Sequence, residues 1–369
     1  MTEENIGTMT EENVITMKAA VGKGYGPIDE MVEVVDNIAK PKEARPGYLI
    51  VRVLACALAP GDLRVLSGRT KMVQGPPSFP YVIGGDVCGI VDSLGEDVEG
   101  FEIGDCVVAR FHTAGPRGGI AEYYEVKSSL TEHKPSNLEP AQASALASSG
   151  TSALIAVNNA IRPGDRVLVL GGSGGVGTIL LQLAAMKKPS FLAVTTSNVP
   201  LVNSLGVADL VLDYNQENWW EVAEVTDKAP FDVIVDLGQG ISAWNLAVKY
   251  KLLKPNAQGG RYHSFVGDDP ILWAQGIFQI LRCMGPALWR NFWTPYFSNW
   301  PSYKWQLDGL PDKREPLTEL FKIVESQNLN IVLSENSPFP FTTEGVRAAM
   351  NLLQTRHAHG KVIVHVADF

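Results

Sequence analysis

Hydrophobic and polar residues alternate along the first third of the chain, in short stretches separated by Gly-rich turns. Residues 48–55 (YLIVRVLA) alternate and are rich in β-branched side chains, as expected of a strand with one buried face. Turns such as Gly95-Glu96 and Gly104-Asp105 divide the region. Further strands are expected at 86–91, 106–110 and 121–126. Short strands joined by frequent turns are typical of a barrel-like β domain.

The pattern changes after residue 140. Residues 140–160 are rich in Ala and predict a helix, after which almost continuously apolar strands alternate with helical stretches. Strands are expected at 166–170, 191–195, 210–213, 231–237 and 260–267, helices between them at 176–186, 201–205, 219–224 and 243–252, then a helix at 344–353 and a strand at 361–366. Apolar strands that alternate with helices indicate a doubly wound parallel sheet covered on both faces. The expected fold class is therefore α/β plus β.

Length and charge narrow the possible functions. A chain of 369 residues is too long for one typical core and favours two domains. The net charge is −9 and no concentrated basic surface is evident, which argues against nucleic acid as a partner. No apolar run approaches the length of a membrane span.

The N-terminus and the cysteines suggest where the protein resides. Residues 1–16 are expected to be a disordered extension, in which MTEEN at 1–5 recurs at 9–13; their glutamates fit neither a secretory nor a mitochondrial signal. The cysteines are too scattered for a disulfide framework and are expected to be small, mostly buried residues: Cys56, Cys88, Cys106 and Cys283. A cytoplasmic location is expected.

The most informative motif is a glycine-rich loop at residues 171–177. It contains GxGxxG, directly follows the expected strand at 166–170 and opens a helix. Glycines let the backbone approach a pyrophosphate, whose charge meets N–H groups at the helix N-terminus. The candidate cofactor-binding residues in it are Gly172, Ser173, Gly174, Gly175, Val176 and Gly177.

The end of the second strand of this unit bears on which dinucleotide binds. An NAD site usually places Asp or Glu about 20 residues after the glycines, on the ribose hydroxyls. This chain has Thr196, Ser197 and Asn198 there, with no carboxylate to repel a 2′-phosphate. NADPH is therefore the expected cofactor, although the nearest cations in sequence are Lys187 and Lys188, before that strand.

Eight ordered segments resemble the medium-chain dehydrogenase/reductase superfamily, and within it the zinc-independent quinone oxidoreductase branch. The segments are 57–68, 84–89, 98–107, the loop at 171–177, 205–214, 231–238 with 253–267, and 360–362. The resemblance implies a GroES-like catalytic β domain (17–150, completed by 313–369) and a Rossmann domain (151–312), with a cleft between them. It also implies NADPH-dependent hydride transfer to a carbon–carbon double bond conjugated to a carbonyl, or to a quinone, and a possible homodimer.

The resemblance assigns further candidates residue by residue. Ser152, Phe265 and Val266 match segments beside the nicotinamide, Leu237 ends a strand at the same edge, and Tyr214 matches a tyrosine near the adenosine. Where relatives often carry an NPxD segment, this chain reads APGD (59–62). Asp62 is a candidate catalytic residue, with helix capping as the alternative. Arg64 is a second candidate, with an ordinary surface cation as the alternative.

The zinc ligands of metal-dependent relatives are replaced. Their cysteine corresponds to Ala59, and their GHE motif corresponds to residues 84–86, where Gly85 replaces the histidine. A catalytic zinc needs about three protein ligands, so no metal is expected. His357 and His359 are expected to be surface residues.

Residues 271–312 hold five of the eight tryptophans: Trp273, Trp289, Trp293, Trp300 and Trp305. Four prolines are expected to interrupt any long helix there. The segment is expected to cover or line the substrate cleft or to form an interface and not to be a second core, with packing onto the Rossmann domain or a partner subunit as the alternative.

Two other functions stay open. A biosynthetic enoyl reductase for one pathway intermediate would suit the tryptophan-rich segment. A non-catalytic NADPH-binding protein would suit the missing asparagine at Ala59. The expected substrate of an enzyme is a small apolar, carbonyl-conjugated molecule.

Overall fold

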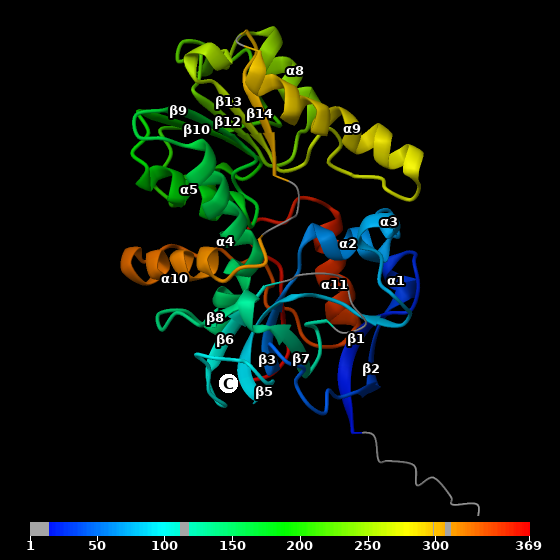
Figure 1. Ribbon diagram of the computed structural model, residues 1–369. Helices are drawn as coiled ribbons and strands as arrows, with labels where there is room; N and C mark the ends of the chain where they lie inside the picture. Colours follow the sequence, from blue (N-terminus) through cyan, green and yellow to red (C-terminus); the bar gives the residue numbers. More distant parts are fainter. Residues whose placement is uncertain (1–14, 111–117, 298, 307–310) are drawn as a thin grey trace, which may run out of the picture.

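A six-stranded parallel sheet forms the upper half of the computed structural model (Figure 1), which describes residues 15–110, 118–297, 299–306 and 311–369. Its strands, in spatial order, are β11 (Leu210–Asp213), β10 (Phe191–Thr196), β9 (Arg166–Leu170), β12 (Val233–Asp236), β13 (Arg261–Ser264) and β14 (Ser302–Trp305). The sheet begins at its centre with β9 and winds outward in both directions. This order confirms the doubly wound sheet and places its switch point beside β9.

Helices cover both faces of this sheet. On one face Leu180 and Val202 join a core with Leu320, and on the other face Trp219 and Trp244 form a second core. The helices of the first face are α4 (Pro140–Ala160), α5 (Gly177–Met186), α6 (Val199–Ser204) and α10 (Glu315–Gln327). Those of the second are α7 (Ala223–Thr226), α8 (Ile241–Lys249) and α9 (Ile277–Trp293). Because both faces are buried, the strands are apolar throughout.

The lower half is built from antiparallel strands, as predicted for a GroES-like β domain (Figure 1). One sheet has the order β15 (Ile363–His365), β3 (Tyr48–Ala57), β5 (Asp86–Leu94), β6 (Cys106–Ala109) and β8 (Thr131–His133), with β7 (Tyr123–Lys127) also on β3. The other has the order β2 (Val32–Ala39), β1 (Thr16–Gly22) and β4 (Tyr81–Val82). The last strand pairs with β3, so the C-terminus completes this domain.

α4 connects the two halves. It packs on β3 and β5 of the β domain and on α5 and α10 of the other half. Its sequence is dominated by Ala, Ser and Gly, whose small side chains allow close approach; a Cβ on Gly150 would lie 2.6 Å from Leu320. The division at residue 150 falls inside this helix and stays a prediction.

The first third of the chain is not entirely β, which corrects the sequence-based expectation. It also contains α1 (Ile28–Met31), α2 (Pro60–Leu66) and α3 (Lys71–Gln74). The expected helix at 219–224 was also wrong, because those residues mostly form turns and the helix is α7. Trp219 is fully buried in the second core, and this burial holds the chain in a turn at that position.

The tryptophan-rich segment is more regular than its prolines suggested. α9 runs for 17 residues with Pro286 inside it, although proline removes one helical hydrogen bond. β14 adds a sixth parallel strand, and its Tyr303 and Trp305 are buried in the second core. The segment therefore packs in part onto the Rossmann domain, which was the alternative expectation.

Remaining elements close the β domain. α11 (Thr343–Gln354) packs on α2 and β2. Short 3-10 turns occur at Ser128–Leu130, Asn256–Gln258 and Thr294–Tyr296. The expected disordered extension lies outside the described residues except for its last two positions, and β1 already begins at Thr16. None of the helices in the described ranges has the length and apolarity needed to cross a membrane.

Candidate functional site

The glycine loop turns tightly between β9 and α5. The N–H groups of Gly171 and Gly172 donate to the carbonyl of Thr195 at 3.0 and 2.9 Å. A Cβ on Gly172 would lie 2.3 Å from Val194, and one on Gly177 would lie 2.6 Å from the carbonyl oxygen of Gly171. These glycines are required by packing, because no side chain fits.

The middle of the loop is open instead. Gly174, Gly175 and Val176 are partly exposed, and a Cβ on Gly174 would meet nothing within 4 Å. α5 begins at Gly177, directly after this stretch, so the positive end of its helix dipole lies at the same place. A space above bare backbone at a helix N-terminus fits the pyrophosphate of a dinucleotide.

The C-terminal segment of the chain holds this loop from the other side. Gly360 N–H donates to the carbonyl of Ser173 at 2.8 Å, and His359 Nδ1 lies 3.3 Å from Ser173 Oγ. Burial lowers the pKa of His359, which favours the neutral ring. His359 is thus partly exposed and tied to the loop by this contact, whereas His357 is exposed.

The expected ribose-binding residues lie at the ends of β10 and β11. Thr196 is fully buried and its Oγ1 accepts the N–H of Asn198 at 3.0 Å; the side chain of Asn198 caps α6 through Leu201 at 3.1 Å. Ser197 is partly exposed between them, and Tyr214 is exposed. Thr196 and Asn198 therefore shape the turn that presents Ser197.

The lysines near β10 lie at the wrong edge for this site. The carbonyl of Lys188 accepts the N–H of Gly164, a residue that lies just before the start of β9. The loop and the ribose candidates lie at the carboxyl ends of the strands. The expected nearest cations therefore do not reach the cofactor edge.

The expected nicotinamide residues continue along the same edge. Leu237 follows β12, and Phe265 and Val266 follow β13. The N–H of Phe265 donates to the carbonyl of Asp236 at 2.9 Å, and that of Val266 donates to Ser264 Oγ at 3.3 Å. Tyr214, the 196–198 turn, the glycine loop, Leu237 and Phe265 thus follow five neighbouring strands in order.

Ser152 approaches this edge from α4. Its carbonyl accepts Nε2 of Gln306 at 3.1 Å, while Oε1 of Gln306 lies 2.8 Å from Nε2 of the buried His263. Gln306 therefore fixes α4 against β13. Sequence reasoning missed it, because it follows a strand that was not predicted.

A buried lysine lies at the junction of the two halves. Lys361 Nζ is 2.8 Å from Ser149 Oγ and 3.8 Å from Asp86 Oδ2, and its Cδ would be 3.1 Å from a Cβ on Gly175. Asp86 also accepts Ser148 Oγ at 2.6 Å. Lys361 was part of the matching segment at 360–362, but nothing in that segment indicates that its charge is buried.

This donor set does not fit zinc. Ala59 supplies no ligand, Gly85 supplies no side chain, and Asp86 faces an ammonium group, which a metal cation would repel. The nearby Cys56 is buried, and burial raises the pKa of its thiol. Over the described ranges, three or more His, Cys, Asp or Glu side chains nowhere gather as a metal site.

Asp62 lies one turn into α2. Its Oδ2 accepts the N–H of Ala59 at 2.8 Å, which completes a helix cap. Burial is the main cause that raises its pKa to about 6, and the negative charge of Asp86 adds to the effect. The capping role is therefore real, and the carboxyl also has a pKa suited to proton transfer near neutral pH.

Arg64 belongs to a group of guanidinium groups at the domain junction. It lies close enough to Arg69 to lower the pKa of Arg69, as does Arg356, although burial is the main cause. Arg356 donates to the carbonyl of Gly238 at 3.0 Å. Arg69 lies 5.9 Å from the ring of Trp273. Arg69 and Arg356 were not predicted, because they come from segments far apart in sequence.

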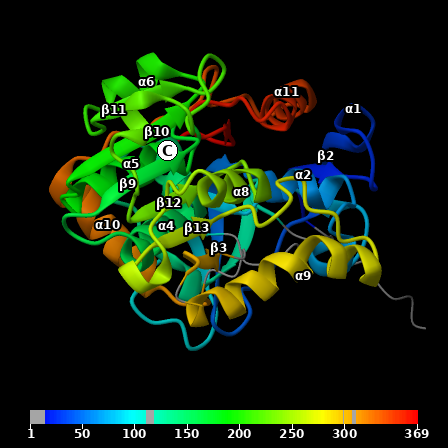
Figure 2. The same cartoon turned by 90° about the horizontal axis from the view of Figure 1, so that it is seen from above.

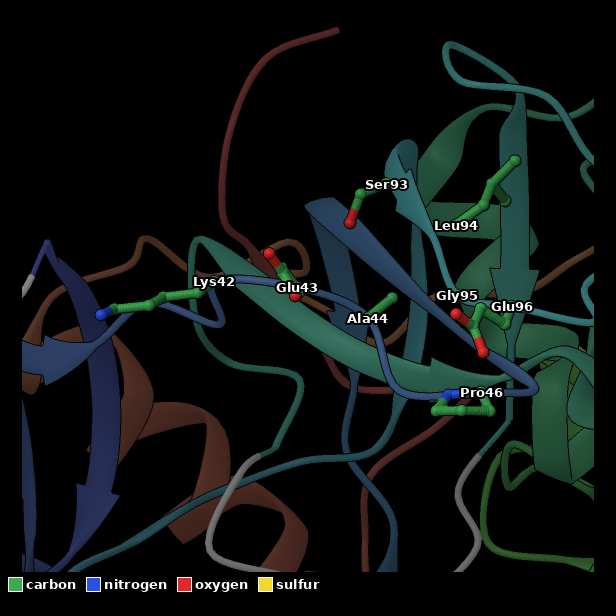
Figure 3. A pocket seen from close by; sticks show the side chains of 8 residues that line it. All are labelled: Lys42, Glu43, Ala44, Pro46, Ser93, Leu94, Gly95 and Glu96. Atoms are coloured by element: carbon green, nitrogen blue, oxygen red, sulfur yellow. The ribbon is translucent and has the colours of Figure 1, made fainter.

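The cysteines are free, as expected, within the described part of the chain. Cys88 and Cys106 lie on adjacent strands with their Sγ atoms 4.0 Å apart. A separate surface hollow, formed by residues 42–44, Pro46, the end of β5 and the turn after it, lies at the start of β3 (Figure 3). β3 is ten residues long, so this hollow is about 30 Å from Asp86 and takes no part in the site.

Comparisons with known proteins agree with this geometry. Residues 45–136 match the model of the alcohol dehydrogenase GroES-like domain, and residues 205–364 match that of zinc-binding dehydrogenases. The second match excludes positions 59 and 84–86. The chain is 31% identical to a 2-methylene-furan-3-one reductase of Solanum lycopersicum and 31% identical to a chloroplastic NADPH-dependent alkenal/one oxidoreductase of Arabidopsis thaliana. Each alignment covers 95% of this chain and 79% of the relative.

A solved structure is similar over nearly the whole chain. It is the quinone oxidoreductase from Coxiella burnetii, at 25% identity and a TM-score of 0.73, covering 95% of this chain and all of that one. The fold joins a doubly wound sheet to a GroES-like β domain, and together with these relatives it defines an oxidoreductase. This chain belongs to the medium-chain dehydrogenase/reductase superfamily, in its quinone oxidoreductase-like branch.

We expect Lys361→Met to destabilise the fold by about 3–5 kcal/mol, because it leaves Asp86 buried without its counter-charge. Urea unfolding measures the effect. Lys254→Met is the control, because Lys254 pairs with Asp232 at 2.6 Å in a more exposed setting and should cost about 1 kcal/mol or less. Equal losses in the two variants would contradict a special role for the buried pair.

Proposed function

We propose that this oxidoreductase uses NADPH to reduce a carbon–carbon double bond conjugated to a carbonyl, or a quinone. The observation that carries the proposal is an open dinucleotide loop beside a site in which Ala59 and Gly85 supply no metal ligand and Asp86 is paired with Lys361. Without a strong Lewis acid, an alcohol oxygen is hard to activate. Conjugate reduction is easier, because negative charge spreads to an oxygen that hydrogen-bond donors or water can stabilise.

The relatives support the same chemistry. Two of them are named as reductases of a methylene-furanone and of alkenals or enones, and the similar solved structure is named as a quinone oxidoreductase. These substrates share an electron-poor double bond conjugated to oxygen. A small apolar molecule of this class is the proposed substrate.

The candidate site residues have different roles along the carboxyl edge of the sheet. A bound nicotinamide supplies the hydride. Gly174 to Val176 bind the pyrophosphate. Tyr214 and Ser197 lie at the adenosine end of the cofactor. The nicotinamide end is bordered by Ser152, Leu237, Phe265 and Val266. Asp62 is the proposed proton donor, and Arg64 the proposed donor to the substrate oxygen.

NADPH is favoured over NADH by the turn after β10. Ser197 is partly exposed there, and the first carboxylate after the strand, Asp209, lies at the opposite end of β10, where it accepts the N–H of Leu192 at 2.7 Å. A hydroxyl in this place can bond a 2′-phosphate without charge repulsion. The cytoplasmic location and a homodimer remain predictions.

Oxidation of NADPH in the presence of a substrate panel tests the function. The panel contains quinones, short and long enones and enals, with saturated ketones and alcohols as controls. We expect turnover of several conjugated substrates and none of the saturated ones. Activity on a single bulky enone would favour the pathway-specific reductase, and tight NADPH binding without turnover of any substrate would favour the non-catalytic protein.

We expect the protein to bind NADPH at least about tenfold more tightly than NADH, or roughly 1.4 kcal/mol. Ser197→Asp should remove most of this preference, because a carboxylate would repel the 2′-phosphate. Fluorescence titration with both cofactors measures it. Ser204→Asp adds the same charge at the far end of α6 and should change neither affinity. An unchanged preference in Ser197→Asp would show that the phosphate lies elsewhere.

We expect kcat to decrease as pH rises through about 6, because the pKa of Asp62 is raised to about 6 and only the protonated carboxyl can donate. Asp62→Asn should remove this inflection and lower kcat by about 10²–10⁴. Asn can still accept the N–H of Ala59, so the helix cap remains.

Asp105→Asn is the control for this prediction. Asp105 accepts the N–H of Glu102 at 2.7 Å with the same three-residue spacing, but it lies on the β domain surface. Its substitution should leave the pH profile unchanged. If Asp62→Asn kept both kcat and the inflection, Asp62 would be a helix cap only.

A further inference from the structure

α9 is an amphipathic helix whose polar side faces the protein and whose apolar side faces outward, the reverse of a helix that packs on a hydrophobic core. Its inward side carries polar contacts: Arg290 pairs with Asp268, and Asn291 Oδ1 accepts the N–H of Trp305 at 2.9 Å. Ala287 is the buried apolar residue of the helix. The opposite side is exposed and largely apolar. We name it the α9 face, and it consists of Phe278, Leu281, Leu288, Trp289 and Phe292 of the helix and Tyr296 of the 3-10 turn that follows it.

The α9 face is large for a surface in water. Phe278 is 83% exposed and Tyr296 is 75% exposed. With about 150–250 Å² per aromatic side chain, the face and its flanking Ile277 and Trp293 expose roughly 900 Å². The largest apolar patch on a typical monomer is about 300–600 Å². Figure 2 shows α9 running along the outside of the molecule toward α2.

The charges around α9 indicate what covers it. Residues 271–306 contain no Asp or Glu, although the whole chain has 40 acidic against 31 basic residues. Of the three basic residues in this segment, Arg290 is paired with Asp268, whereas Arg282 and Lys304 are exposed. Arg282 is exposed beside the α9 face. Trp, Tyr and Phe next to Arg on one helix face are typical of helices that lie in a membrane interface.

A neighbouring helix extends the surface. The N–H of Met72 in α3 donates to the carbonyl of Ala274 at 3.2 Å, just before α9 begins. Met72 and Val73 are exposed, at 59% and 55%, and Lys71 is exposed with them. α3 therefore adds apolar side chains and a positive charge near the N-terminal end of α9.

A second copy of the chain fits this pattern less well. In a twofold dimer the same patch meets itself, so the basic rim around Arg282 would face its own copy without acidic residues to compensate. An anionic lipid surface supplies the missing negative charge. Its headgroup region also accommodates rings with one polar edge, as in Trp289 and Tyr296.

We propose that the α9 face, together with Met72 and Val73, docks on the interface of an anionic lipid bilayer. The aromatic side chains enter the headgroup and acyl boundary, and Arg282 and Lys71 remain at the level of the phosphates. The helix lies on the membrane and does not cross it. This binding does not depend on the proposed reaction, so it can be tested without a substrate.

Vesicle flotation of the full-length protein tests the proposal. The vesicles are phosphatidylcholine alone or with about 30 mol % phosphatidylserine. We expect wild type to float with the anionic vesicles, and the double variant Phe278→Asp/Trp289→Asp to bind at least about tenfold more weakly. Arg282→Glu changes the charge by two and should weaken binding to anionic vesicles about 30-fold, since each basic residue near the surface contributes about 1 kcal/mol.

Ile103→Asp is the matched control. Ile103 is 70% exposed on the β domain and lies outside the α9 face, so flotation should not change. Circular dichroism and the thermal midpoint verify that each variant is folded. Failure of wild type to float, or flotation of folded Phe278→Asp/Trp289→Asp equal to that of wild type, would overturn the proposal. So would a wild-type dimer that ignores vesicles and becomes monomeric in the double variant, which would assign the face to a second copy.

Discussion

The contact between Lys361 and Asp86 unites the parts of the chain on which the site depends. Lys361 lies just before β15 at the end of the chain, Asp86 begins β5, and Ser149 belongs to α4. The stem of the lysine lies against Gly175 in the dinucleotide loop. A buried charge without a partner is costly, so these four segments must meet for the fold to be stable. The same requirement places the cofactor loop beside the β domain.

The parallel sheet could be predicted because its signals are local. β9, β11 and α4 begin and end where the apolar pattern does, since each strand is buried on both faces and bounded by turn residues. β1, β2 and α10 were not predicted, and their formation depends on partners distant in sequence. β1, for example, is held between β2 and β4, which follow it by more than ten and sixty residues. The sequence around β1 alone does not indicate those partners.

The residues of the candidate site likewise include some that local sequence predicts and others that it does not. The glycine loop and the 196–198 turn are specified by adjacent residues, and the structure places both at one edge of the sheet. Gln306, His359, Arg69 and Arg356 act through contacts between segments more than a hundred residues apart, as when Arg356 reaches Gly238. Their residue types are common on surfaces. Sequence alone gives no reason to single them out until the fold brings them together.

The prolines of the tryptophan-rich segment predicted that no long helix forms there, yet the segment forms α9. Pro286 argues against a helix because it removes one hydrogen bond and its ring meets the preceding turn. Tertiary contacts on the inner side of the helix, from Arg290 to Asp268 and from Asn291 to Trp305, offset that loss. Those contacts use the polar side chains of α9, so its aromatic side chains face outward. A helix stabilised in this way keeps its apolar face available for a partner, and the absence of acidic residues between 271 and 306 makes an anionic partner the complementary one.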